Sequence, residues 1–141
     1  MKIERIDHVA IRVKNMREAC KFFSEVFGLE FTEIGENKEM DVRSSINALG
    51  IEVVEPLTPG GVTAKSIESG GEGLALLSLK VANIDEAAAE MRARGIKEVG
   101  KMERAGVKVR IYHPKDTYGV MIELIEYKDK HPLLAAFAQP G

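Results

Sequence analysis

Three ionisable side chains in this 141-residue sequence have types and surroundings suited to a metal-binding or proton-transfer site. Glu123 lies inside an apolar run of strand length, residues 119–126, where an unpaired carboxylate would sooner take up a proton than stay ionised. The same pattern recurs at residues 50–55, with Glu52 in the position of Glu123. A carboxylate on a buried strand face needs a compensating partner, so both glutamates are candidate functional residues.

His8 supplies the third candidate group, in a strand-like alternation over residues 6–13. One imidazole and two carboxylates from three strands suit divalent Mn, Fe, Co, Ni or Mg better than a thiolate site for structural zinc. A simpler interpretation also stands, in which His8 is a hydrogen-bonded core residue. The glutamates would then pair with Arg12, Arg43 or Lys80.

The elements that would position these residues begin with a helix after the first strand. Asn15 is a typical N-cap, Glu18 follows at the capping-box position, and Gly28 is a natural left-handed end. The apolar residues between them recur at helical spacing. Beyond the helix the pattern predicts three strands, at residues 29–34, 40–49 and 50–55. A polar turn at 35–37 is predicted to follow the first of these strands.

The second half of the chain repeats this order. Asn83 and Glu86 form the next cap, Gly95 ends the helix, and strands are predicted at 96–103, 107–113 and 119–127. The repeat predicts one α+β domain over residues 1–141, because neither half could bury its sheet alone. Its parts are two tandem βαβββ modules at 3–57 and 73–127, a connector at 58–72 with a short helix at 62–69, and a C-terminal extension at 128–141.

Composition excludes several classes of protein. A net charge of -2 with no basic cluster gives no footprint for nucleic acid, and no apolar run approaches the ~20 residues of a membrane span. The single cysteine, Cys20, cannot form an internal disulfide and falls on the apolar side of the first helix. These features predict a cytoplasmic protein. The apolar residues of the C-terminal extension are expected to cover a sheet edge or a partner subunit.

Five segments together resemble the vicinal oxygen chelate superfamily, also called the glyoxalase/bleomycin resistance/dioxygenase superfamily. The resemblance covers nearly the whole chain and is closest to methylmalonyl-CoA epimerases, with lactoylglutathione lyases next. The segments that carry it are Asp7–Ile11, Glu52–Pro56, Gly71–Leu74, His113–Thr117 and Gly119–Leu124.

The resemblance implies a cup-shaped mixed sheet of paired βαβββ modules around a divalent metal such as Co, Ni, Mn, Fe, Zn or Mg, often in a homodimer. It places His8, Glu52 and Glu123 at metal-ligand positions. Leu76 stands where the epimerases have a ligating histidine, so we expect the metal to bind weakly or not at all. Such enzymes also use a second carboxylate, for which Glu33 and Glu36 are the candidates.

By resemblance, the expected activity is a metal-assisted isomerase or lyase that removes a proton beside a thioester or carbonyl, with an acyl-CoA or similar thioester as substrate. Glu123 would serve as a ligand, and Glu123 or an opposing glutamate would take the proton. The alternative is a non-catalytic protein of the bleomycin-resistance type that binds a small molecule. Leu76 favours this alternative, because a leucine supplies no ligand atom.

Overall fold

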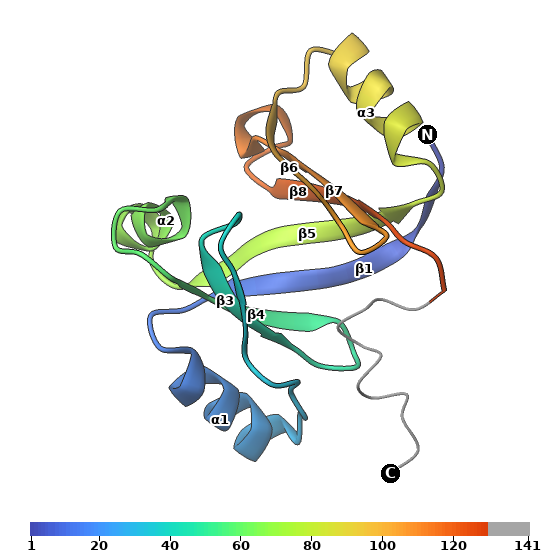
Figure 1. Ribbon diagram of the computed structural model, residues 1–141. Coiled ribbons are helices and arrows are strands. Elements are labelled where there is room, and N and C mark those ends of the chain that lie inside the picture. The colour runs from blue at the N-terminus through green and yellow to red at the C-terminus, as the bar shows by residue number, and fades with distance from the viewer. Residues whose placement is uncertain (130–141) are drawn as a thin grey trace. The chain divides into compact units, whose positions relative to one another are not determined.

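The structure is a computed structural model and describes residues 1–129. The expectation for the C-terminal extension falls mainly on residues 130–141, which lie outside the described part. Figure 1 labels most of the elements, which follow the repeated order predicted from the sequence. They are β1 (Ile3–Arg12), α1 (Met16–Phe27), β2 (Gly35–Asn37), β3 (Val42–Ile46), β4 (Ile51–Pro56), α2 (Val62–Gly70), β5 (Gly73–Val81), α3 (Ile84–Ala93), β6 (Glu98–Arg104), β7 (Val107–Tyr112), a 3-10 turn η1 (Pro114–Asp116) and β8 (Met121–Glu126).

Two compact units divide the described chain. Unit 1 combines Met1–Val9 with residues 75–129, and unit 2 consists of Ala10–Leu74. Strand β1 therefore begins in unit 1 and ends in unit 2. The predicted module boundaries, and the superposition of residues 3–57 on 73–127, stay predictions.

Unit 2 is organised around the antiparallel strands β2, β3 and β4, against which α1 and α2 pack. The N-cap of α1 is as predicted, because the Asn15 side chain accepts a hydrogen bond from the backbone of Glu18 at 3.1 Å. Gly28 ends the helix in the left-handed conformation, with φ 67°. Met16 of α1 is buried in a cluster with Val13 and Val53, and Cys20 packs against this cluster.

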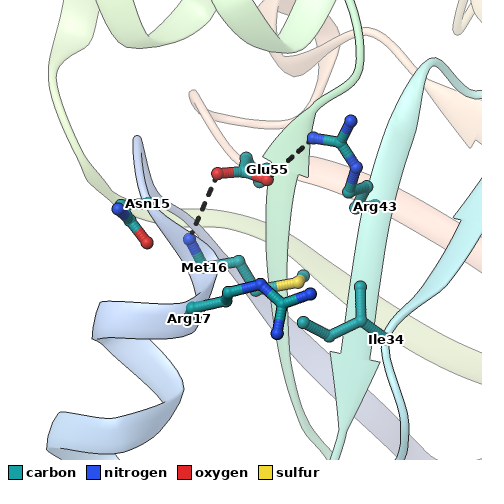
Figure 2. Close-up of a pocket in the computed structure, with 6 residues that line it drawn as sticks. All are labelled: Asn15, Met16, Arg17, Ile34, Arg43 and Glu55. Atoms are coloured by element: carbon teal, nitrogen blue, oxygen red, sulfur yellow. Dashed lines mark hydrogen bonds and ion pairs between the residues drawn. The ribbon is translucent and has the colours of Figure 1, made fainter.

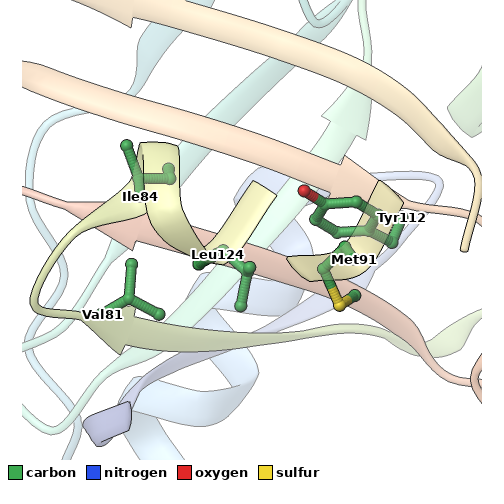
Figure 3. Close-up of a cluster of buried hydrophobic side chains, with 6 residues drawn as sticks. Val81, Ile84, Met91, Tyr112 and Leu124 are labelled. Carbon is green, nitrogen blue, oxygen red and sulfur yellow. The ribbon is translucent and has the colours of Figure 1, made fainter. Parts of the chain in front are cut away.

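Unit 1 contains the strand order β5-β8-β7-β6. Strands β5 and β8 are parallel, whereas β8 with β7 and β7 with β6 are antiparallel. Helix α3 starts at the predicted cap, where the Asn83 side chain accepts from Asp85 and Glu86, and it packs on β7 and β8. This arrangement encloses the apolar cluster drawn in Figure 3, which consists of Val81, Ile84, Ala87, Met91, Tyr112 and Leu124.

Tyr112 carries a polar atom into that cluster. Its side chain is 1% exposed, and its hydroxyl has no hydrogen-bond partner among residues 1–129. Burial raises the pKa of this phenol, which therefore stays neutral. A buried hydroxyl without a partner costs free energy that an apolar ring of the same shape would not.

We expect Tyr112→Phe to raise the free energy of unfolding by about 1 kcal/mol, because it removes this desolvation cost and keeps the ring. Urea unfolding at constant pH measures the change. Tyr118→Phe is the matched control, since that side chain is fully exposed. A Tyr112→Phe protein less stable than the wild type would show that the hydroxyl has a favourable partner.

The strand predicted at residues 29–34 is wrong, and so is the turn predicted at 35–37. The predicted strand has only one isolated bridge, between Phe31 and Asn47, whereas 35–37 pairs with β3 as β2. The apolar spacing at 29–34 reflects partial burial instead, because Phe31 and Ile34 pack against the cluster of Val13, Met16 and Val53. Glu36 joins β2 to β3 through an ion pair with Arg43 at 3.3 Å.

No helix within residues 1–129 has the length and apolar character needed to cross a membrane.

Candidate active site

Strand register in unit 1 sets the immediate neighbours of Glu123. In the parallel pair β5/β8, Ser78 is the register partner of Glu123, and in the antiparallel pair β7/β8 the partner is Ile111. The Ser78 hydroxyl donates a hydrogen bond to Oε1 of Glu123 over 2.7 Å. The carboxylate therefore has a polar neighbour on one side and an apolar one on the other.

His8, on β1, completes the surroundings of this carboxylate within unit 1. Its Nε2 atom lies 3.5 Å from Oε1 of Glu123, and the two side chains are 5% and 12% exposed. The structure thus brings together two of the three residues predicted as metal ligands. They meet at a position shielded from solvent.

The surroundings of Glu123 raise the pKa of its carboxyl above the usual value. Burial raises the pKa of this carboxyl, and the negative charge of Asp7 acts in the same direction. The interaction with His8 and the hydrogen bond from Ser78 lower the pKa, but burial outweighs them. A carboxyl with a raised pKa is a stronger proton acceptor when it is ionised, which suits a general base.

Asp7 contacts the other ring nitrogen of the imidazole. Its Oδ2 atom lies 2.6 Å from Nδ1 of His8, and both side chains are buried. Tyr127 donates a hydrogen bond to Oδ1 of Asp7, and the Arg5 guanidinium lies 3.2 Å from the same oxygen. A continuous polar chain therefore runs from Arg5 and Tyr127 to Glu123.

The other predicted site residues lie in unit 2. Glu52 is half-buried on β4, where its register partner is Ile46 of β3. Glu33 and Glu36 are both exposed, and Glu36 pairs with Arg43. The convergence of Glu52 with His8 and Glu123, and the catalytic roles of Glu33 and Glu36, stay predictions.

The donor atoms of unit 1, an imidazole nitrogen and a carboxylate oxygen, are of types that bind divalent cations, but there are few of them. His8 Nε2 and Glu123 Oε1 face each other across a gap of the size that two ligands of one metal ion span. Within the described residues, no group of three or more His, Cys, Asp or Glu side chains is close enough to hold a metal. Leu76, the register partner of Met121, adds an apolar side chain two residues from Ser78. Any metal held here would rely on additional ligands.

The cations considered as partners of the glutamates make other contacts. Lys80 donates to Glu4, and its ammonium lies 4.9 Å from the centre of the Tyr127 ring. Arg12 donates to the carbonyl of Gly71 and to the hydroxyl of Ser66. Within unit 1, Glu123 is therefore compensated by Ser78 and His8.

Sequence reasoning missed Ser78, Asp7 and Tyr127. For Asp7 a signal existed, because it directly precedes His8 and a carboxylate commonly orients a functional imidazole. For Ser78 the parallel register of β5 with β8 decides the contact, and no local pattern encodes that register. Tyr127 follows β8 and meets Asp7 only through the tertiary fold.

A cavity of about 380 Å³ lies elsewhere, in unit 2, between the start of α1 and strands β3 and β4 (Figure 2). Its central carboxylate, Glu55, accepts hydrogen bonds from the Met16 backbone and from Arg43 at 3.3 and 3.0 Å. These polar groups satisfy one another. None of the predicted site residues lines this cavity, whose lining consists of Asn15, Met16, Arg17, Ile34, Arg43 and Glu55.

A sequence profile places the chain in a family. The profile of the Glyoxalase/Bleomycin resistance protein/Dioxygenase superfamily matches residues 5–124, which include most of β1, most of β8 and every element between them. The chain belongs to this superfamily. The predicted class, an α+β fold of the glyoxalase kind, is thereby confirmed.

Individual relatives are similar over most of their length. The mitochondrial methylmalonyl-CoA epimerase of Mus musculus is 28% identical over 130 residues, which is 87% of this chain and 73% of that protein. A probable lactoylglutathione lyase of Vibrio parahaemolyticus is 29% identical over 131 residues, 88% of this chain and 91% of that one. The Streptomyces coelicolor methylmalonyl-CoA epimerase, solved in complex with 2-nitronate-propionyl-CoA, has a TM-score of 0.82 at 25% identity, covering 91% of this chain and 100% of that one.

Proposed function

We propose that this protein is an isomerase that removes a proton from the carbon beside a thioester or carbonyl group, as an epimerase or a glyoxalase does. The observation that carries the proposal is the buried contact between Glu123 and His8, with Ser78 on the same carboxyl oxygen. Relatives named as methylmalonyl-CoA epimerases and as a lactoylglutathione lyase support the reaction class. An acyl-CoA or another thioester is the proposed substrate.

Each residue of the site has a proposed role in the proton transfer. Glu123 accepts the proton from the substrate carbon, because its raised pKa makes the protonated product stable. Ser78 keeps Oε1 oriented, and burial excludes water that would compete for the proton. Epimerisation also needs a base on the opposite face of the carbon, and Glu33 and Glu36 are the proposed candidates.

A divalent metal is part of the proposal. His8 and Glu123 would hold it, with Glu52 as the proposed third ligand. Such an ion would stabilise negative charge on the oxygens of the substrate. Because Leu76 supplies no ligand atom, we expect weaker binding than in a protein with four ligating side chains. A homodimer and a cytoplasmic location complete the proposal.

Proton exchange in deuterated water tests this function. Wild-type protein, stripped of metal and then supplied with Mn, Co, Ni or Zn, is incubated with methylmalonyl-CoA, and NMR follows loss of the C2 proton. We expect exchange well above the uncatalysed background. A parallel assay uses the hemithioacetal of methylglyoxal and glutathione. If neither substrate reacts with any of the four metals, the isomerase proposal fails.

The second candidate is a binding protein without catalysis. It is favoured by the apolar pair Leu76 and Met121, which are register partners on the strands that carry Ser78 and Glu123. This candidate predicts saturable binding of a small molecule without any proton exchange. Calorimetric titration of the same thioesters therefore separates the two candidates.

A further inference from the structure

Asp7 controls which nitrogen of His8 faces Glu123. Nδ1 of the imidazole lies 2.6 Å from the Asp7 carboxylate. An ionised carboxylate accepts hydrogen bonds and has no proton to donate. Nδ1 must therefore carry the proton. In a neutral ring this leaves a lone pair on Nε2, the atom that faces Glu123. The tautomer follows from the hydrogen-bond partners.

Asp7 is itself fixed from two sides. Tyr127 donates its hydroxyl to Oδ1, and the Arg5 guanidinium contacts both this oxygen and the Tyr127 hydroxyl. Burial, followed by the hydrogen bond to Asp7, raises the pKa of Tyr127, so the phenol remains a donor. The guanidinium of Arg5 places a positive charge 3.2 Å from the Asp7 carboxylate. These contacts together fix the orientation of the Asp7 carboxylate.

The consequence appears at the opposite nitrogen. The Nε2 lone pair and Oε1 of Glu123 are both acceptors when the carboxylate is ionised, and they face each other at 3.5 Å. Two acceptors at this distance repel unless a proton or a cation lies between them. With the other tautomer, Nε2 would donate to Glu123 and leave no lone pair there for a cation.

We propose that Asp7 is a positioning residue that keeps His8 in the Nδ1–H tautomer, and that Tyr127 and Arg5 hold Asp7 in place for this purpose. The effect is an Nε2 lone pair directed at Glu123, ready for a metal ion or for a proton shared with the carboxyl. The proposal builds on the proposed function only in taking His8 and Glu123 as the site.

Long-range ¹H–¹⁵N NMR of the histidine rings tests the tautomer directly, and the chain offers an internal reference. Nδ1 of His113 accepts a hydrogen bond from the Lys115 backbone at 3.0 Å, so this ring must be the Nε2–H tautomer. The wild-type spectrum should therefore show opposite tautomers for His8 and His113. Single His8→Gln and His113→Gln variants assign the signals.

Three variants separate positioning from general support of the fold. Asp7→Ala should abolish the preference for Nδ1–H at His8 and leave His113 unchanged. Asp7→Asn keeps an acceptor oxygen and should retain the tautomer. Asp129→Ala, in an exposed position, is the control and should change neither ring. Calorimetry with Ni and Zn should show metal affinity reduced by about 10- to 100-fold in Asp7→Ala, the range found for removal of residues that orient a ligand.

An Nε2–H tautomer at His8 in the wild type, or an Asp7→Ala protein that keeps Nδ1–H, would overturn the inference. If Asp7→Ala does not fold by circular dichroism, the wild-type and Asp7→Asn spectra decide, since both must show Nδ1–H. Absence of thioester turnover with the expected tautomers would refute the proposed function and leave the positioning role standing. The two failures are thus distinguishable.

Discussion

Replacing Glu123 with glutamine is expected to slow proton exchange at a thioester substrate by about 100-fold or more, the effect of losing a general base. Glutamine has the same shape and can still accept the hydrogen bond from Ser78, but its amide is a very poor proton acceptor. The expected loss is therefore in turnover, with the fold preserved. Deuterium exchange into methylmalonyl-CoA, corrected for the uncatalysed rate, measures it.

Glu103→Gln is the matched control, because Glu103 is an exposed carboxylate of the same unit. A Glu123→Gln protein that retains full exchange would assign the base elsewhere, and Glu33 and Glu36 would be replaced next.

The pH dependence of stability gives a second measurement on Glu123→Gln. Since burial raises the pKa of Glu123 above 4.5, its stabilising contribution is complete below that pH and is lost as pH rises through the folded-state value. The glutamine variant should not show this pH-dependent loss.

Replacing Leu124 with alanine should lower the free energy of unfolding by about 3 kcal/mol, within the usual range for a buried leucine. Leu124 is 2% exposed and packs in the cluster below α3 (Figure 3). It is the direct neighbour of Glu123, yet successive strand residues point to opposite faces. Substitution of Leu124 should thus lower stability, whereas substitution of its neighbour Glu123 should lower the rate of proton exchange.

Urea unfolding followed by circular dichroism measures this loss. Leu74→Ala is the control, since Leu74 is 72% exposed, and it should change stability by no more than about 0.5 kcal/mol. An equal effect of the two substitutions would contradict the assignment of Leu124 to the core. Exchange activity per folded molecule should be little changed in Leu124→Ala.

Helix boundaries were the most predictable part of the fold. The signals at Asn15, Gly28 and Asn83 are local, and the structure places caps or ends at each of them. The position of β2 was not predictable, because pairing with β3 decides it and residues 29–34 have the stronger apolar pattern. A buried loop and a half-buried strand produce the same spacing of apolar side chains.

The candidate site was predictable only where a residue is unusual in its own segment. Glu123 and His8 stand out as polar groups among apolar neighbours, and the structure brings them together. Ser78 looks ordinary in sequence and matters because of a register between strands far apart along the chain. Roles that depend on such long-range pairing leave no local signal.

Unit 1 is assembled from two stretches, 1–9 and 75–129, and this division has a consequence for biosynthesis. During translation His8 emerges early, but its carboxylate partner lies on β8, the last strand of the described chain. Contacts between residues so distant in sequence form late, because closing the intervening loop costs entropy. A nascent chain that stops before β8 would contain His8 but lack Glu123. We therefore expect the contact between His8 and Glu123, and any activity that depends on it, to form only when β8 pairs with β5.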